Sequence, residues 1–354
     1  MKPLIKNLIY MILLLAITFD LFTCKDFKIT SDDESELMDA IEELNTNGGK
    51  IFINTTVINI KREINITGDF RGGIFGIRQD SGEYPRIHFL NKAGSNSGIN
   101  IIGSKKDLQF IIIENAQGNG ISIFGDYNSL SHVVSRYNYG SGIVVYGDYS
   151  TLYFCYSYRN CDATLKSVNA DGFLIYGKED NLLDHCYAWD NANSGFNYVR
   201  IKNYSEIKFL DCGSWNNGNI DVFTGKYDYD LGNTLDKNLW TIQAIMKSDL
   251  DFSRTFYNKQ YNIHYAKIDG ISVEEWIAKV EPKMDGNGFV FGNQNSSQST
   301  DIIFNVFYCA TFDNKNGGFI DNYKHKYNII MEECASFNNY INYKLPYTFS
   351  KWEK

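Results

Sequence analysis

A six-residue pattern of apolar and polar positions recurs along the chain. It starts with Cys, has a small residue at its third position and an aromatic residue at its fourth, and ends with Asn. Copies begin at Cys155, Cys186, Cys212, Cys309 and Cys334. An earlier copy, 133–138, has Val133 in place of the Cys. A unit this short cannot bury its own apolar face, so we expect the copies to stack on one another.

A second pattern, Gly followed by Ile or Phe, alternates with the first. Its apolar members are Ile121, Ile143, Phe173, Phe196, Phe289 and Phe319. Ile121 and Ile143 are 22 residues apart, and Phe173 and Phe196 are 23 apart. A period near 22, rich in β-branched and aromatic residues, is typical of a solenoid. We therefore predict an all-β fold, a right-handed parallel β-helix, over residues 25–350.

Stacked coils place equivalent residues at strand spacing, about 4.8 Å apart. The repeated cysteines then form an interior ladder, in which we favour buried thiols over disulfides. The repeated Asn residues form a second ladder at a turn, where their amides bond to each other and to the backbone. Cys161 falls outside the ladder, and no Cys-x-x-Cys pair indicates a zinc site. The aromatic members are expected to pack in the core or at turns; they are Tyr158, Trp189, Trp215, Phe312 and Phe337.

The repeat is preceded by one helical pattern and interrupted by another. Residues 31–34, Ser-Asp-Asp-Glu, form a capping box. Leu37, Ile41 and Leu44 follow on one face, so we expect an amphipathic helix that closes the first coil. Between about 218 and 285 the repeat is lost, and 234–247 and 272–280 have helical periodicity. This segment is predicted to be a mainly helical insertion from one coil.

The first residues have the character of a targeting segment. Lys2 and Lys6 precede an apolar run, 8–19, that is too short to span a membrane comfortably. We predict a signal peptide over 1–24 and a secreted protein, with a signal anchor, or a lipid anchor at Cys24, as the alternative. Glycosylation sequons fit this route; they begin at Asn54, Asn65, Asn203 and Asn295.

Composition and charge narrow the range of partners. The chain has 354 residues, of which 21% are charged, and a net charge of −8. A protein that binds nucleic acid needs a basic surface, so this partner class is excluded. The same charge argues against simple electrostatic binding of an acidic polymer. We expect a monomer.

Three segments resemble the core of the family 9 polysaccharide lyases, which are pectate lyases. They are Asn-Ala-Asp-Gly-Phe at 169–173, the string 186–197, and Gly-Asn-Gly-Phe-Val-Phe-Gly at 286–292. The resemblance extends from about 48 to 339, apart from the insertion. It implies β-elimination on polygalacturonate, in which Ca²⁺ neutralises the uronate carboxylate and a neutral Lys removes the C5 proton.

The resemblance also locates the site and shows what has changed there. The family's first Asp ligand is kept as Asp171, but its Asp-Asp-Gly-Trp-Asp string is Asn193, Ser194, Gly195, Phe196 and Asn197 here. The family's Lys position is Val290, which cannot accept a proton. The resemblance thus implies a degraded calcium site at Asp171, Asn193, Ser194 and Asn197. A Ca²⁺ cofactor is implied by the family, and the loss of carboxylates argues against it.

Other residues offer substitutes, and the spacing selects none of them. Lys178, Lys202 and Lys226 are candidate bases, and Asp190 and Asp221 are candidate ligands. Asp171 alone is equally well read as a turn residue that accepts backbone N–H groups. The five histidines have no partner at ligand spacing and are interpreted as structural or exposed; they are His88, His132, His185, His264 and His325.

Three functions remain open from the sequence. The first is a secreted pectate-lyase-like protein that binds pectin or polygalacturonate of plant cell walls with a degraded site. The second is an active polysaccharide lyase that cleaves an acidic polysaccharide with a rearranged site. The third is a glycoside hydrolase on the same fold, for which no matching carboxylate pair is evident.

Overall fold

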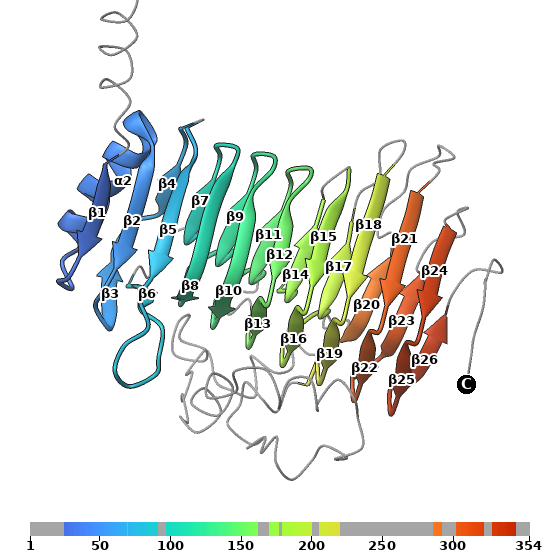
Figure 1. Ribbon diagram of the computed structural model, residues 1–354. Helices are drawn as coiled ribbons and strands as arrows, with labels where there is room; N and C mark the ends of the chain where they lie inside the picture. Colours follow the sequence, from blue (N-terminus) through green and yellow to red (C-terminus); the bar gives the residue numbers. More distant parts are fainter. Residues whose placement is uncertain are drawn as a thin grey trace, which may run out of the picture.

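The computed structural model describes residues 25–68, 70–90, 97–161, 170–176, 179–199, 205–219, 286–291, 302–321 and 328–344. Its strands run in parallel and stack as successive coils, from blue at the first coil to red at the last (Figure 1). They form a 17-stranded sheet, called sheet A, and a 9-stranded sheet, called sheet B. The predicted parallel β-helix is confirmed. The predicted signal peptide and all but 218–219 of the predicted insertion lie outside the described residues.

Each complete coil contributes one strand to sheet B and two arms to sheet A. Sheet B contains β4 (Ile64–Ile66), β7 (Ile99–Ile101), β9 (Ile121–Ile123), β11 (Ile143–Val145), β14 (Phe173–Ile175), β17 (Phe196–Tyr198), β20 (Asn287–Phe291), β23 (Gly317–Asp321) and β26 (Ile341–Lys344). The first arm of sheet A contains β1 (Asp26–Ile29), β2 (Gly49–Ile53), β5 (Gly72–Gly76), β12 (Thr151–Tyr153), β15 (Asn181–Asp184), β18 (Ser205–Leu210), β21 (Ile302–Phe307) and β24 (Asn328–Glu332). The second arm contains β3 (Val57–Ile60), β6 (Arg86–Phe89), β13 (Tyr156–Tyr158), β16 (Tyr187–Trp189), β19 (Gly213–Trp215), β22 (Ala310–Phe312) and β25 (Ala335–Phe337). Two long strands, β8 (Lys106–Glu114) and β10 (Ser129–Arg136), contribute to both arms.

The Gly–Ile/Phe pattern forms a continuous column inside sheet B. Phe173 pairs with Phe196, and Phe196 with Phe289, in adjacent parallel strands. Their rings stack at centroid distances of 4.8 and 4.5 Å. The Gly before each apolar residue allows the second arm to come close. A Cβ atom on Gly195, for example, would lie 1.9 Å from Ser214 Oγ. This contact explains why the pattern needs Gly at one position and a small residue at the other.

The Asn ladder is continuous through six coils. Each of the first five side chains donates from Nδ2 to Oδ1 of the Asn in the next coil, over 2.9 to 3.0 Å. The members are Asn138, Asn160, Asn191, Asn217, Asn314 and Asn339. From Asn160 onward, each Oδ1 also accepts the backbone N–H of the preceding member, as Asn217 Oδ1 does from Asn191. The ladder therefore holds the turn after the second arm in the same shape in every coil.

The outward aromatic residues of the second arm form a stack. Tyr158 and Trp189 lie 4.4 Å apart, Trp189 and Trp215 lie 5.0 Å apart, and Trp215 and Phe312 lie 5.5 Å apart. These four side chains are at most 4% exposed. Phe337 continues the register beside Phe312. The expectation that these rings are packed, rather than open platforms for sugars, is confirmed for the first four.

The described cysteines are free thiols, and those of the ladder point into the core. Cys155, Cys186, Cys212 and Cys309 are fully buried, whereas Cys334 is half-buried. Burial raises the pKa of the four inner thiols well above its usual value. Their predicted role as small apolar residues is confirmed, and Cys161, outside the ladder, is a buried thiol as well.

We expect the ladder thiols to resist chemical labelling in the native protein. A thiol reacts as its thiolate, which burial both disfavours and shields, so labelling should be about 100-fold slower than in denaturant. The measurement is alkylation over time followed by peptide mass spectrometry. Cys334 serves as the internal control and should react first. If Cys186 and Cys212 were labelled as fast as Cys334, the ladder would not be buried as described.

The helix α2 (Glu34–Asn47) covers the first coils beside β1 and β2 (Figure 1). Leu37, Ile41 and Leu44 are buried, as their spacing predicted. The predicted capping box is wrong in one respect. Asp33, not Ser31, is the N-cap, and its carboxylate accepts the Ser35 N–H over 2.9 Å. Ser31 instead donates to Glu36. Within the part of the chain that the structure describes, no helix is long and apolar enough to cross a membrane.

Candidate functional site

The candidate site residues lie on three successive strands of sheet B and the turns that lead into them. Asp171 comes just before β14, and Asn193 and Ser194 come just before β17. Asn197 is the middle residue of β17, where it pairs with Leu174 of β14 and Val290 of β20. All five residues that the sequence singled out therefore lie in neighbouring coils. Their side chains are buried, with Asp171 and Ser194 at 0% exposure.

Among the described residues, three uncharged N–H groups donate to the Asp171 carboxylate. Its Oδ1 accepts from Asn193 Nδ2 over 2.7 Å and from the Ser194 backbone N–H over 2.9 Å. Its Oδ2 accepts from Asn197 Nδ2 over 3.0 Å. Hydrogen bonds to the charged form of a carboxylate are among the strongest that uncharged donors make. Asp171 thus links the turns of two coils, which is the role of a structural turn residue.

This donor set does not match the calcium site that the resemblance implies. Ca²⁺ takes six to eight oxygen ligands, and carboxylates balance its charge. Here a single carboxylate is present among these four residues, and both of its oxygens face N–H groups. Two other buried oxygens, Ser194 Oγ and Asn197 Oδ1, have no hydrogen-bond partner among the described residues. They are neutral acceptors and supply little charge for a divalent ion.

The residue at the position of the family's Lys, Val290, is apolar and buried. Val290 is 3% exposed and lies in register beside Asn197 and Ile320. In the same outward column, Leu174 lies two coils earlier and Val144 three coils earlier, and these two side chains pack together. A hydrocarbon side chain cannot accept the C5 proton of a uronate, so β20 provides no base at 290. The candidate substitutes Lys178, Lys202, Lys226 and Asp221 lie outside the described residues.

Asp190, the other candidate ligand, is engaged elsewhere on the same turn. Its Oδ2 lies 3.3 Å from Arg159 Nε, and its Oδ1 accepts from Asn216 Nδ2 over 2.6 Å. Burial raises the pKa of Asp190, and the Arg159 charge opposes this. The carboxylate is therefore part of an ion pair between coils.

A row of aromatic side chains borders sheet B where each strand ends. Phe124, Tyr146 and Tyr176 follow β9, β11 and β14, and adjacent rings stack at 4.8 Å. Phe124 is 47% exposed and Tyr146 is 37% exposed. Burial is the main cause that raises the pKa of Tyr176, with smaller contributions from Tyr146 and the Asp171 charge. Sequence reasoning missed this row, although the Gly–Ile/Phe pattern has an aromatic residue three positions after its apolar member in these three copies.

Comparison with known proteins identifies relatives of the fold. The family model described as "Pel9A-like, right handed beta helix region" matches residues 26–233. Among solved structures, pectate lyase Pel9A aligns with a TM-score of 0.54 and 15% identity, covering 88% of this chain and 70% of its own. An alginate lyase from Paenibacillus sp. str. FPU-7 aligns with a TM-score of 0.38 and 9% identity, covering 90% of this chain and 99% of its own. No curated protein sequence matches.

Proposed function

The chain belongs to the Pel9A-like right-handed β-helix family, and on that premise we propose that it binds a pectin-type polysaccharide of plant cell walls without cleaving it. The observation that carries this proposal is the state of Asp171. Its carboxylate accepts hydrogen bonds from Asn193, Ser194 and Asn197, which supports a role in holding two turns together.

The chemistry of β-elimination explains why cleavage is not part of the proposal. The C5 proton of a uronate is removed only when the adjacent carboxylate is neutralised and a base is within reach. In this chain the ion would have one carboxylate among the four family positions, and the base position is Val290. Losing either the ion or the base raises the barrier, and losing both leaves no route through the family's mechanism.

The surface beside sheet B supplies contacts suited to sugar. Phe124 and Tyr146 present apolar edges to solvent, and the Tyr146 hydroxyl can exchange hydrogen bonds with sugar hydroxyls. The net charge of −8 disfavours attraction of a polyuronate from a distance. We therefore expect binding that depends on aromatic and polar contacts and weakens little as salt is added.

The proposal also covers secretion and the oligomeric state. We infer a secreted, monomeric glycoprotein with a signal peptide over 1–24, as the first residues and the sequons suggest. Of the described sequons, Asn54 follows β2. Asn65 lies within β4, and its amide is already bonded to Glu63 and Asn100. Asn54 is accordingly the better glycan acceptor, which peptide mass spectrometry of the secreted protein would check.

The test combines a lyase assay with a binding assay. Incubation with polygalacturonate and Ca²⁺ should give no sustained rise in ultraviolet absorbance from unsaturated products. Affinity electrophoresis in pectin should retard the protein, and Tyr146→Ala should weaken binding about 3- to 10-fold, the loss expected for one aromatic contact. Tyr340→Ala, which removes an 85% exposed ring near the last coil, should bind like the unmodified protein.

Two outcomes would contradict the proposal. A sustained absorbance rise that EDTA abolishes would show the second function considered from the sequence, an active lyase with a rearranged site. Electrophoretic mobility unaffected by pectin, in a protein that neither cleaves nor binds, would exclude a role on this polymer.

A further inference from the structure

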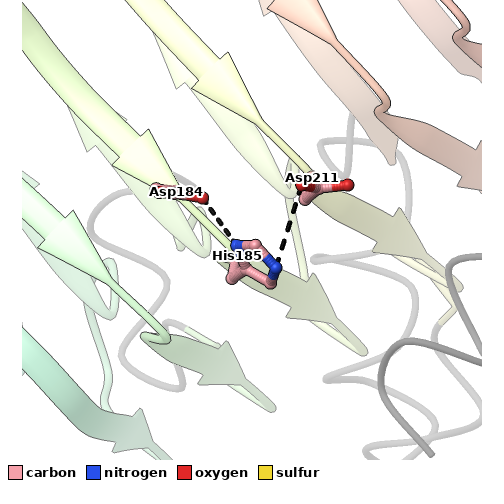
Figure 2. Close-up of side chains that lie close together, drawn as sticks. All are labelled: Asp184, His185 and Asp211. Atoms are coloured by element: carbon pink, nitrogen blue, oxygen red, sulfur yellow. Dashed lines mark hydrogen bonds and ion pairs between the residues drawn. The ribbon is translucent and has the colours of Figure 1, made fainter. Parts of the chain in front are cut away.

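Three metal-ligating side chains meet on sheet A, away from the sheet B site. Asp184 is the last residue of β15, and His185 follows it at the bend between the two arms (Figure 2). Asp211 occupies the corresponding bend one coil later, after β18. The imidazole lies between the two carboxylates, as the dashed lines in Figure 2 show. The expectation that His185 has no partner is therefore wrong.

The stacking of coils brings this group together. Asp184 pairs with Leu210 in adjacent parallel strands, so the residues that follow, His185 and Asp211, stack on each other. Both adopt a left-handed backbone conformation, with φ of 52° and 49°. The same conformation recurs before every cysteine position of the ladder from His132 to Glu333. The bend therefore aims one side chain per coil along a single column, and here that column contains a His next to an Asp.

The distances within the group suit coordination. His185 Nδ1 lies 2.6 Å from Asp184 Oδ1, and His185 Nε2 lies 3.8 Å from Asp211 Oδ2. One ligand atom from each residue can be chosen so that all three lie within 4.8 Å of one another. Two atoms bound to one Zn²⁺ at about 2.0–2.2 Å are about 3.4 Å apart at a tetrahedral angle. The gap of 3.8 Å is too long for a hydrogen bond and is close to this value.

The charges and exposure of the group also favour a cation. Two carboxylates face one imidazole, and like charges at this separation repel unless a positive charge lies between them. The three side chains are 23–31% exposed, so water can reach the group and complete a coordination shell.

We propose that Asp184, His185 and Asp211 bind one divalent transition-metal ion. Asp211 and His185 Nε2 are direct ligands, and Asp184 either completes the set or holds the ring through Nδ1, as carboxylates do in many His–metal sites. Imidazole with carboxylate ligands favours Zn²⁺ and its first-row neighbours over Ca²⁺ and Mg²⁺, which take oxygen ligands. The ion links two coils. Because it binds the folded chain and not the unfolded chain, it stabilises the fold.

Isothermal titration of the full chain with ZnCl₂, without an affinity tag, tests the proposal. We expect saturable binding of one ion, and a rise in the thermal midpoint of about 2 °C or more at saturating Zn²⁺. His185→Asn and Asp211→Asn should each weaken binding at least tenfold and abolish the thermal shift. Asn is chosen because it tolerates the left-handed backbone at both positions.

A matched control variant distinguishes loss of the metal site from a general effect of replacing a residue at this bend. His132 lies two coils earlier in the same column, with φ of 54°, and its Nδ1 is bonded to Ser131 rather than to a carboxylate. His132→Asn should leave Zn²⁺ binding unchanged, and so should Asp171→Asn on sheet B. The proposal is overturned if Zn²⁺ does not saturate the protein, if both site variants bind it with unchanged affinity, or if His132→Asn weakens binding as much as His185→Asn.

Discussion

Glu114→Gln should lower the free energy of unfolding by about 3–5 kcal/mol, the loss typical of breaking a buried ion pair. Glu114 and Arg136 are 3% and 2% exposed. Glu114 Oε2 accepts from Arg136 Nε over 2.8 Å and from Nη2 over 2.7 Å. Arg136 also donates to the Tyr158 hydroxyl over 2.9 Å, which fixes the guanidinium in place. The substitution keeps the volume but removes the carboxylate charge that faces the buried Arg136 guanidinium.

The measurement is urea unfolding followed by circular dichroism, with Lys208→Gln as the control. Lys208 pairs with Glu206 over 3.3 Å on the surface, with side chains 46% and 40% exposed. Such a pair contributes between zero and about 1 kcal/mol. If the two variants lost similar amounts of stability, the Glu114 pair would be no more important than a surface contact.

The lowered pKa of the Glu114 carboxyl group also predicts how the free energy of unfolding changes in acid. Burial raises the pKa of Glu114, but Arg136, His88 and Arg86 together outweigh this and hold the pKa at about 2, below its usual value of 4.5. A carboxyl group with a lowered pKa in the folded state stabilises that state above its unfolded pKa. This contribution is fully present above about pH 4.5 and is lost as the pH falls towards 2. The unmodified protein should therefore lose stability more steeply than Glu114→Gln in this window.

Asn191→Ala should cost about 2–4 kcal/mol, because it interrupts the ladder in its middle. Asn191 Oδ1 accepts from the Asn160 backbone N–H and from Asn160 Nδ2. Its Nδ2 donates to Asn217 Oδ1 and to the Ser157 carbonyl oxygen. Each buried polar group left without a partner costs about 1–3 kcal/mol, and rearrangement recovers part of the sum. The lost contacts belong to three adjacent coils, so cooperativity of unfolding should fall as well.

Asn100→Ala is the control for the ladder variant. Asn100 is half-buried in sheet B, and its amide donates to Asn65 Oδ1 over 2.9 Å. Its removal should cost about 1 kcal/mol, the net value of an ordinary hydrogen bond. Equal losses in urea unfolding for Asn191→Ala and Asn100→Ala would contradict a stabilising role specific to the ladder.

The two stability predictions bear on how the candidate site is held. The turn that contains the Asn191 rung continues into Asn193 and Ser194, which bind the Asp171 carboxylate. Weakening the ladder should therefore loosen this contact and change the sheet B face where we propose that polysaccharide binds. The Glu114 pair lies on the second arm of sheet A and should affect stability without altering that face.

Some of this structure followed from the sequence alone. The period near 22 specified the coil, the Cys, Asn and Gly–Ile/Phe positions specified its ladders, and the spacing of Leu37, Ile41 and Leu44 specified the buried face of α2. These predictions succeeded because a solenoid contacts only its neighbouring coils. Equivalent positions in a repeat then become neighbours in space, and a pattern read along the chain becomes a column of contacts.

Only the tertiary structure decided the contacts that depend on the direction of each side chain within its coil. The sequence placed Asn193, Ser194 and Asn197 beside Asp171, but pairing and the turn determined that their N–H groups enclose the carboxylate. His185 and Asp211 are far apart in sequence and meet because the bend in each coil adopts a left-handed conformation and points them along one column. The order of residue types determines the period of the fold. The register of the strands and the backbone angles at the bends determine the geometry of its sites.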